Sequence, residues 1–128
     1  MNIAFVANGK KTEFFFHISE EIRKELDNVN IYFICCSKKK YDYYLKQDIS
    51  SDRLLLINWS IKNLNRSQIG EYKLNELAGY DRKKKFYFND GIKYLSNLQS
   101  VFYDFINNNN IKYVFGEMTW AHEILMAR

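Results

Sequence analysis

The chain has 128 residues and a mass of 15.4 kDa, which suits one domain of ordinary size. Hydrophobic residues make up 47% and aromatic residues 17%, so a mainly disordered state, a collagen-like repeat and a disulfide-stapled scaffold are excluded. The formal net charge of +4 gives only weak support to nucleic-acid binding. The start of the chain lacks the basic region and the apolar length of a signal peptide, so we expect a cytoplasmic protein.

The first element is a short apolar run at residues 3–7, which predicts a buried strand ending at the turn signal Asn8-Gly9. Thr12 is the expected N-cap of the amphipathic helix that follows, which has about sixteen residues. Apolar residues recur on this helix at a spacing of four, at Phe14, Ile18, Ile22 and Leu26.

Strands and helices continue to alternate after this helix. Residues 31–36 predict a second strand, a short helix follows Ser37, and residues 53–57 predict a third strand. The next part is harder to interpret: a buried turn is expected around Trp59, Ile61 and Leu64, and a short helix at residues 72–77.

The last third contains the longest helical pattern, from residue 88 to residue 106. Four asparagines, residues 107–110, are expected to end it, because asparagine tolerates the left-handed cap conformation. Residues 111–115 predict the fourth strand, and Thr119 is the expected cap of an apolar closing helix at residues 120–128. Since this helix stops while still apolar, we expect the chain to be one lobe of a longer protein.

This alternation predicts an α/β fold: a Rossmann-like, three-layer domain with a parallel sheet of about four strands in the order 3-2-1-4. Ligands of such sheets bind beyond the carboxyl ends of the strands, where the strand order reverses. Two loops are expected to meet there, residues 8–11 and residues 116–119.

The first of these loops, Asn8-Gly9-Lys10-Lys11, is a candidate substrate-binding loop. Free amides at a helix start favour an anion, and the two lysines add positive charge. The dinucleotide fingerprint needs three spaced glycines, and here Gly9 stands alone. A tight turn with solvated lysines therefore remains the alternative.

The second loop carries the candidate catalytic residue, Glu117. A carboxylate just after a strand lies at the rim of the sheet, where it can act as a base or hold sugar hydroxyls. Thr119 and Trp120 are candidate substrate-binding residues, because an indole can stack on a sugar ring. The alternative is that these residues only cap and pack the last helix.

No metal site is expected. His17 and His122 stand alone in the sequence, and no His or Cys pair has metal-ligand spacing. Cys35 and Cys36 are adjacent, and we interpret them as reduced, half-buried strand residues, because a vicinal disulfide is strained.

Two basic clusters stand next to aromatic residues, at residues 38–40 and 82–85. Such clusters can bind nucleic-acid phosphates or an anionic membrane leaflet, or they can simply be solvated. Lysines before a helix oppose its dipole, so neither cluster is there for helix stability.

Residues 1–9 and the closing run Tyr-Val-Phe-Gly-Glu-Met-Thr-Trp-Ala-His-Glu at residues 113–123 resemble segments of bacterial capsular and cell-surface polysaccharide biosynthesis proteins. Those proteins are similar to glycosyltransferases of the two-lobed GT-B type. The resemblance implies that residues 1–128 form a single α/β domain, the N-terminal, acceptor-side lobe. It places Asn8 and Gly9 on a loop facing the cleft, and Glu117 and Thr119 on the fourth-strand loop.

The resemblance also implies partners. A glycan or lipid-linked glycan acceptor would bind here, with peripheral contact to the inner face of the cell membrane. A nucleotide-sugar donor is expected for the full-length protein and no cofactor for this fragment, which would be inactive alone and could dimerise. Two alternatives stay open: a stand-alone nucleotide-binding α/β module, or a basic interaction module, although nucleic acid is not the expected partner.

Overall fold

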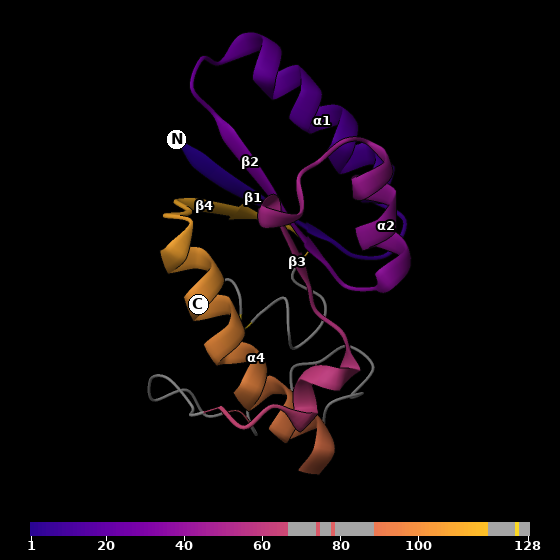
Figure 1. Cartoon of the computed structure of the whole chain (residues 1–128), viewed down its shortest axis with the longest axis vertical. Helices are drawn as coiled ribbons and strands as arrows, with labels where there is room; N and C mark the ends of the chain where they lie inside the picture. Colours follow the sequence, from indigo (N-terminus) through magenta and orange to yellow (C-terminus); the bar gives the residue numbers. More distant parts are fainter. Residues whose placement is uncertain (67–73, 75–77, 79–88, 118–124, 126–128) are drawn as a thin grey trace. The chain divides into compact units, whose positions relative to one another are not determined.

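The computed structural model describes residues 1–66, 74, 78, 89–117 and 125. The chain divides into two compact units, one of residues 1–58 and 109–116, the other of residues 59–108 and 117–128. The first unit contains a parallel sheet, and the second contains a long helix (Figure 1). That residues 1–128 form the N-terminal lobe of a longer protein stays a prediction.

The first unit follows the predicted alternation of strands and helices. Its four strands lie in the order β3-β2-β1-β4, and all neighbouring pairs are parallel. This confirms the predicted α/β, Rossmann-like fold and the order 3-2-1-4. The elements are β1 (Asn2–Ala7), α1 (Thr12–Glu25), β2 (Asn30–Cys35), α2 (Lys38–Lys46), the 3-10 helix η1 (Ser51–Arg53), β3 (Leu54–Leu56) and β4 (Tyr113–Phe115).

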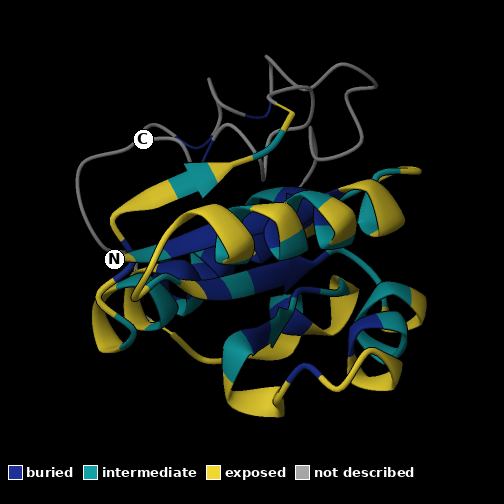
Figure 2. Ribbon diagram, turned by 90° about the horizontal axis from the view of Figure 1, so that it is seen from above, coloured by how far each residue is buried: buried dark blue, intermediate teal, exposed yellow. Residues whose placement is uncertain are grey.

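The two central strands form the buried middle of the sheet. β1 and β2 pair along their whole length, from Asn2 opposite Asn30 to Ala7 opposite Cys35. Their apolar residues lie largely within the buried colour in Figure 2. Both strands are therefore near-continuous apolar runs, as expected of a parallel sheet.

The outer strands are shorter than predicted. β3 spans three residues instead of the predicted 53–57, and β4 spans three instead of 111–115. Ile57 and Ile111 are still buried just outside these strands, at 1% and 7% exposure. Burial thus extends further along the chain than the hydrogen-bonded ladder does.

The core-facing side of α1 differs from the predicted stripe. Phe15 and Ser19 are buried, whereas Phe14 and Leu26 are 55% and 48% exposed. A spacing of four residues overshoots the helical turn of 3.6 residues, so the ends of the predicted stripe drift away from the core. The N-cap is Lys11 rather than Thr12, and no side chain caps this end of the helix.

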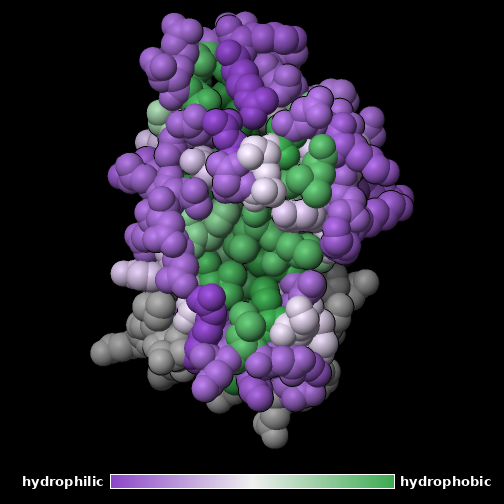
Figure 3. All heavy atoms as spheres, viewed as in Figure 1, coloured by the Kyte–Doolittle hydropathy of each residue, from purple (hydrophilic) through white to green (hydrophobic). Residues whose placement is uncertain are grey.

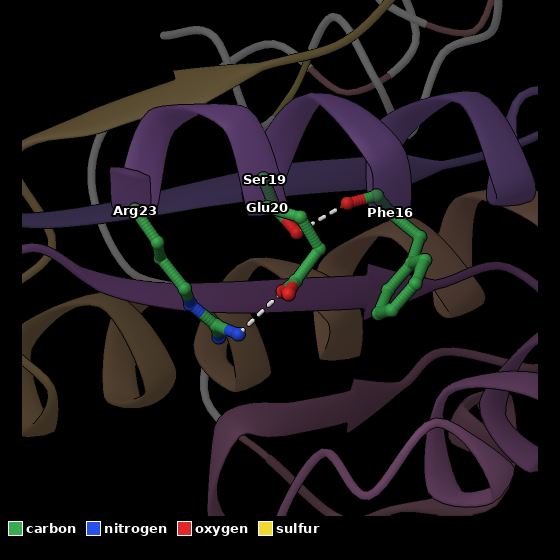
Figure 4. Close-up of polar contacts among 4 residues, drawn as sticks. All are labelled: Phe16, Ser19, Glu20 and Arg23. Atoms are coloured by element: carbon green, nitrogen blue, oxygen red, sulfur yellow. Dashed lines mark hydrogen bonds and ion pairs between the residues drawn. The ribbon is translucent and has the colours of Figure 1, made fainter. Parts of the chain in front are cut away.

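Ser19 is a fully buried polar residue in the middle of α1. Its hydroxyl donates to the carbonyl of Phe16 at 2.6 Å, which satisfies the donor within the helix (Figure 4). One residue further, Glu20 forms an ion pair with Arg23 at 2.7 Å. The polar groups of this part of α1 are therefore paired within the helix.

α2 packs on the same face of the sheet as α1, and both helices contribute to one hydrophobic core. Ser37 is the N-cap, and its side chain accepts a hydrogen bond from the backbone of Lys40. Tyr44 is completely buried, and its ring stacks on Phe33 of β2 with centroids 4.0 Å apart. The short helix predicted after Ser37 is confirmed.

α2 ends in a Schellman motif whose left-handed residue is an aspartate. Asp48 has φ of 59°, and the amide of Ile49 donates to the carbonyl of Tyr44 at 3.1 Å. Asn28 and Asn110 adopt the same left-handed backbone, with φ of 60° and 48°. The predicted role of the asparagine run after the long helix is therefore confirmed at Asn110.

The second unit joins the 3-10 helix η2 (Trp59–Asn63) to the long helix α4 (Asn89–Asn108). The buried amide of Asn97 donates to the carbonyls of Ile61 and Lys62 at 3.0 and 3.2 Å. Ile61 is buried as predicted, whereas Trp59 and Leu64 are 38% and 41% exposed. The long helix is confirmed, with Leu95, Leu98 and Phe102 buried.

Several predictions fall outside the described residues. These are the basic cluster at 82–85, the Thr119 cap and most of the helices expected at 72–77 and 120–128. Within the two expected helices, Leu74 and Leu125 are described, and both are helical and buried.

Candidate functional site

The first and fourth strands are neighbours, so the loops that follow them start at the same edge of the sheet. β1 pairs with β4 in parallel, with Ile3 opposite Tyr113 and Phe5 opposite Phe115. A Cβ atom placed on Gly116 would lie 2.9 Å from the Cβ of Val6. In the order β3-β2-β1-β4, β4 lies on the side of β1 opposite to β2, so the chain changes direction across the sheet between β1 and β4. Ligands of such sheets bind at this point.

The loop after β1 is a tight turn built by Asn8 and Gly9. The side-chain oxygen of Asn8 accepts from the amide of Gly9 at 2.8 Å. Gly9 has φ of +58°, a left-handed conformation that glycine adopts without steric cost. The turn leaves Lys10 exposed just before α1.

A hollow lies where the chain leaves β1 and β2, which we call the lysine pocket. Its volume is about 360 Å³. It is lined by Gly9, Lys10, Thr12, Glu13, Lys39, Lys40 and Tyr43. The outer surface over α1 and α2 is mostly hydrophilic (Figure 3).

A hydrogen bond holds the two walls of the lysine pocket together. The hydroxyl of Tyr44 donates to the carbonyl of Thr12 at 2.9 Å, which ties α2 to the first turn of α1. Lys38 does not line the pocket; it forms an ion pair with Asp42 and lies over the ring of Tyr41. The lysines that α2 contributes to the pocket are therefore the next two residues, Lys39 and Lys40.

Hydrogen-bond donors dominate the chemistry of the lysine pocket. Burial, and then the carboxylate of Glu13, raise the pKa of the Tyr43 hydroxyl, so this group keeps its proton at neutral pH. Burial raises the pKa of the nearby Cys35 thiol to about 12, although the charge of Lys40 opposes this. Cys35 is thus an inert thiol rather than a nucleophile. The arrangement suits binding an anion.

Glu13 is the acidic member of the pocket. Its carboxylate lies 3.8 Å from the ring nitrogen Nε2 of His17 on the next turn of α1. Both side chains are largely exposed, so the pair adds little to stability.

The predicted site residues divide into two groups. Asn8, Gly9 and Lys10 lie at the carboxyl edge of the sheet, and two of them line the lysine pocket. Glu117 follows Gly116 directly, is exposed and belongs to the second unit. Thr119 and Trp120 lie outside the described residues. The catalytic role of Glu117 stays a prediction.

Sequence reasoning missed the part that α2 plays in this site. It treated residues 38–40 as a separate basic cluster, whereas the structure brings Lys39 and Lys40 to the same pocket as Lys10. The signal was present, because both lysine groups follow strands that the predicted order makes neighbours.

No family model, no curated protein and no solved structure matches the chain. Among the described residues, no helix is long and apolar enough to cross a membrane. The same residues contain no group of three or more acidic, His or Cys side chains placed to hold a metal ion.

Proposed function

We propose that the chain is the acceptor-binding, N-terminal lobe of a GT-B-like glycosyltransferase of bacterial surface or capsular polysaccharide biosynthesis. The observation that supports this most is the pairing of β1 with β4. It starts the Asn8–Lys10 loop and the segment after Gly116 from adjacent strands, at the edge where parallel sheets bind ligands. The sequence resemblance of residues 113–123 points to the same function.

In this proposal, the loop of Asn8, Gly9 and Lys10 holds the hydroxyls of a glycan or lipid-linked glycan acceptor. Glu117 is the proposed general base for the attacking hydroxyl, and Thr119 and Trp120 are the other proposed substrate-binding residues. The nucleotide-sugar donor binds to a second lobe, so this chain alone binds acceptor without transferring sugar.

A titration with surface-polysaccharide oligosaccharides, followed by amide NMR shifts, tests the binding part. We expect shifts at Gly9, Lys10 and Gly116, and weaker binding in Lys10→Gln. Lys46→Gln is the matched control, because Lys46 is exposed in the last turn of α2. Shifts confined to residues 89–108 would reject the proposal.

The catalytic part needs the protein that also carries the donor lobe. Glu117→Gln is expected to slow transfer by about 10²–10⁴-fold, which is what a general base contributes. Unchanged transfer would remove Glu117 from the mechanism and leave the acceptor-binding role intact.

A second candidate is a stand-alone nucleotide-binding module. The lysine pocket favours it, because Gly9 and Lys10 line that hollow together with two lysines of α2. Calorimetry with nucleoside diphosphates separates the two functions. Micromolar binding to this chain alone, without response to oligosaccharides, would favour the nucleotide-binding module.

A further inference from the structure

The lysine pocket concentrates positive charge from two separate elements. Lys10 comes from the loop after β1, and Lys39 and Lys40 come from the first turn of α2. Within the described part of the chain, neither Lys10 nor Lys39 forms an ion pair, and the Lys40 ammonium contacts the Ser37 hydroxyl at 3.5 Å. These three charges are therefore available to a ligand.

Three other cations of these helices are paired. Arg23 and Lys24 bind carboxylates on their own helix, at 2.7 and 2.6 Å, and Lys38 binds Asp42. A second hollow of about 340 Å³ contains Arg23 and Arg53 but also two aspartates, so its charges compensate one another. The lysine pocket differs because its cations outnumber its single carboxylate.

The position of these lysines works against the stability of the helix. α2 has no acidic residue in its first turn and begins with three lysines, although the positive end of the helix dipole disfavours cations there. Mutual repulsion of neighbouring ammonium groups adds to this cost. A bound anion would offset both effects.

The rest of the lysine pocket suits a phosphate group. Gly9 leaves open space, since nothing lies within 4 Å of a Cβ built there. α1 starts without a side-chain cap, because the Lys11 side chain at its N-cap accepts no capping hydrogen bond. Tyr43 contributes a protonated hydroxyl. Three lysines against Glu13 leave two positive charges, which match the charge of a phosphomonoester, about −1.5 to −2.

We propose that the lysine pocket is a binding site for a phosphomonoester or diphosphate group, held by Lys10, Lys39 and Lys40. The inference does not require the acceptor-lobe function, because the phosphate can belong to a nucleotide or to a lipid diphosphate. The proposed phosphate site therefore includes the first turn of α2 as well as the loop after β1.

Calorimetric titration of the chain with inorganic pyrophosphate at low salt tests the site. We expect saturable binding that weakens as salt rises, and about a tenfold loss of affinity for each of Lys10→Gln and Lys39→Gln, because charge-assisted hydrogen bonds are lost. Lys46→Gln removes one charge from the same helix outside the pocket and should bind like the original chain.

Circular dichroism and urea unfolding of each variant keep a folding defect from being mistaken for lost binding. No saturable binding by the original chain, or equal weakening by Lys46→Gln, would overturn the proposal. A nucleoside diphosphate that binds more tightly than pyrophosphate identifies a nucleotide, whereas tighter binding to micelles carrying a polyprenyl diphosphate identifies the lipid source. The oligosaccharide titration is separate, so either proposal can fail alone.

Discussion

Gly116→Ala tests the contact between β4 and β1 on which the candidate site depends. The new Cβ would lie 2.9 Å from the Cβ of Val6 and 3.2 Å from its Cγ2, well inside the usual carbon–carbon separation of about 3.5–4.0 Å. The atom in the way belongs to the stem of a β-branched side chain and cannot rotate aside. One strand must therefore move.

The magnitude follows from two opposing terms. Overpacking of this kind costs about 1–3 kcal/mol. Alanine recovers about 0.4–1 kcal/mol by restricting the unfolded chain, because Gly116 does not use the left-handed backbone that would penalise a side chain. We expect the free energy of unfolding to fall by about 1.3 kcal/mol, within a range of about 0–2.6 kcal/mol.

Urea unfolding followed by circular dichroism measures the change, with Gly9→Ala as the matched control. The control has open space but a left-handed backbone, so its loss comes from strain and not from Val6. In a Val6→Gly background, which removes the Cβ that is in the way, the cost of Gly116→Ala should shrink by at least about 0.5 kcal/mol, whereas the cost of Gly9→Ala should not change. A stabilising Gly116→Ala, or a cost that does not shrink in the Val6→Gly background, would refute the close approach of the two strands.

Three further predictions concern buried groups. Tyr44→Phe removes the hydrogen bond to the Thr12 carbonyl, so the free energy of unfolding in urea should fall by about 0.5–1.5 kcal/mol; no loss would mean that this bond is not formed in solution. Asn97→Ala strips the Ile61 carbonyl of a buried donor and should cost about 1–3 kcal/mol, which hydrogen exchange across residues 59–63 would register as faster opening. The native Cys35 thiol keeps its proton up to about pH 12, whereas the unfolded thiol loses it near pH ~8.5. Stability from this group is therefore complete below pH ~8.5 and falls by up to ~1.4 kcal/mol per pH unit between pH ~8.5 and the folded pKa of about 12. Cys35→Ala should show a smaller slope between pH ~8.5 and ~10, below the range in which Tyr44, whose pKa burial also raises, adds a slope of the same sign.

The strand order could be predicted because few alternatives fit the chain. Short apolar runs such as residues 3–7 predict buried strands, and the right-handed crossovers between parallel strands restrict the possible topologies. The buried face of α1 could not be predicted equally well. Phe14 and Phe15 are both large and apolar, and only the packing of β1, where Phe5 stacks on Phe15 at 5.2 Å, decides which one is buried.

In the candidate site, too, part could be predicted from the sequence and part could not. The loop at Asn8 and Gly9 could be placed at the carboxyl edge of the sheet from topology alone. Which lysines line the pocket could not, because successive residues of a helix point about 100° apart. Lys38 turns to Asp42, while Lys39 and Lys40 face the pocket, and this depends on the helix starting at Lys38.

Asp48, just after α2, has a left-handed backbone conformation that is sterically unfavourable for a residue with a side chain. A side chain in this conformation destabilises the folded state by about 1–2 kcal/mol. Glycine avoids that strain, but it loses about 0.5–1 kcal/mol because its unfolded chain has more conformational entropy. The chain contains five glycines. The left-handed conformation, which glycine adopts with the least strain, is taken here by Asn28, Asp48 and Asn110. Replacing them would give a sturdier scaffold, on which weakening substitutions elsewhere could be studied without losing the folded protein.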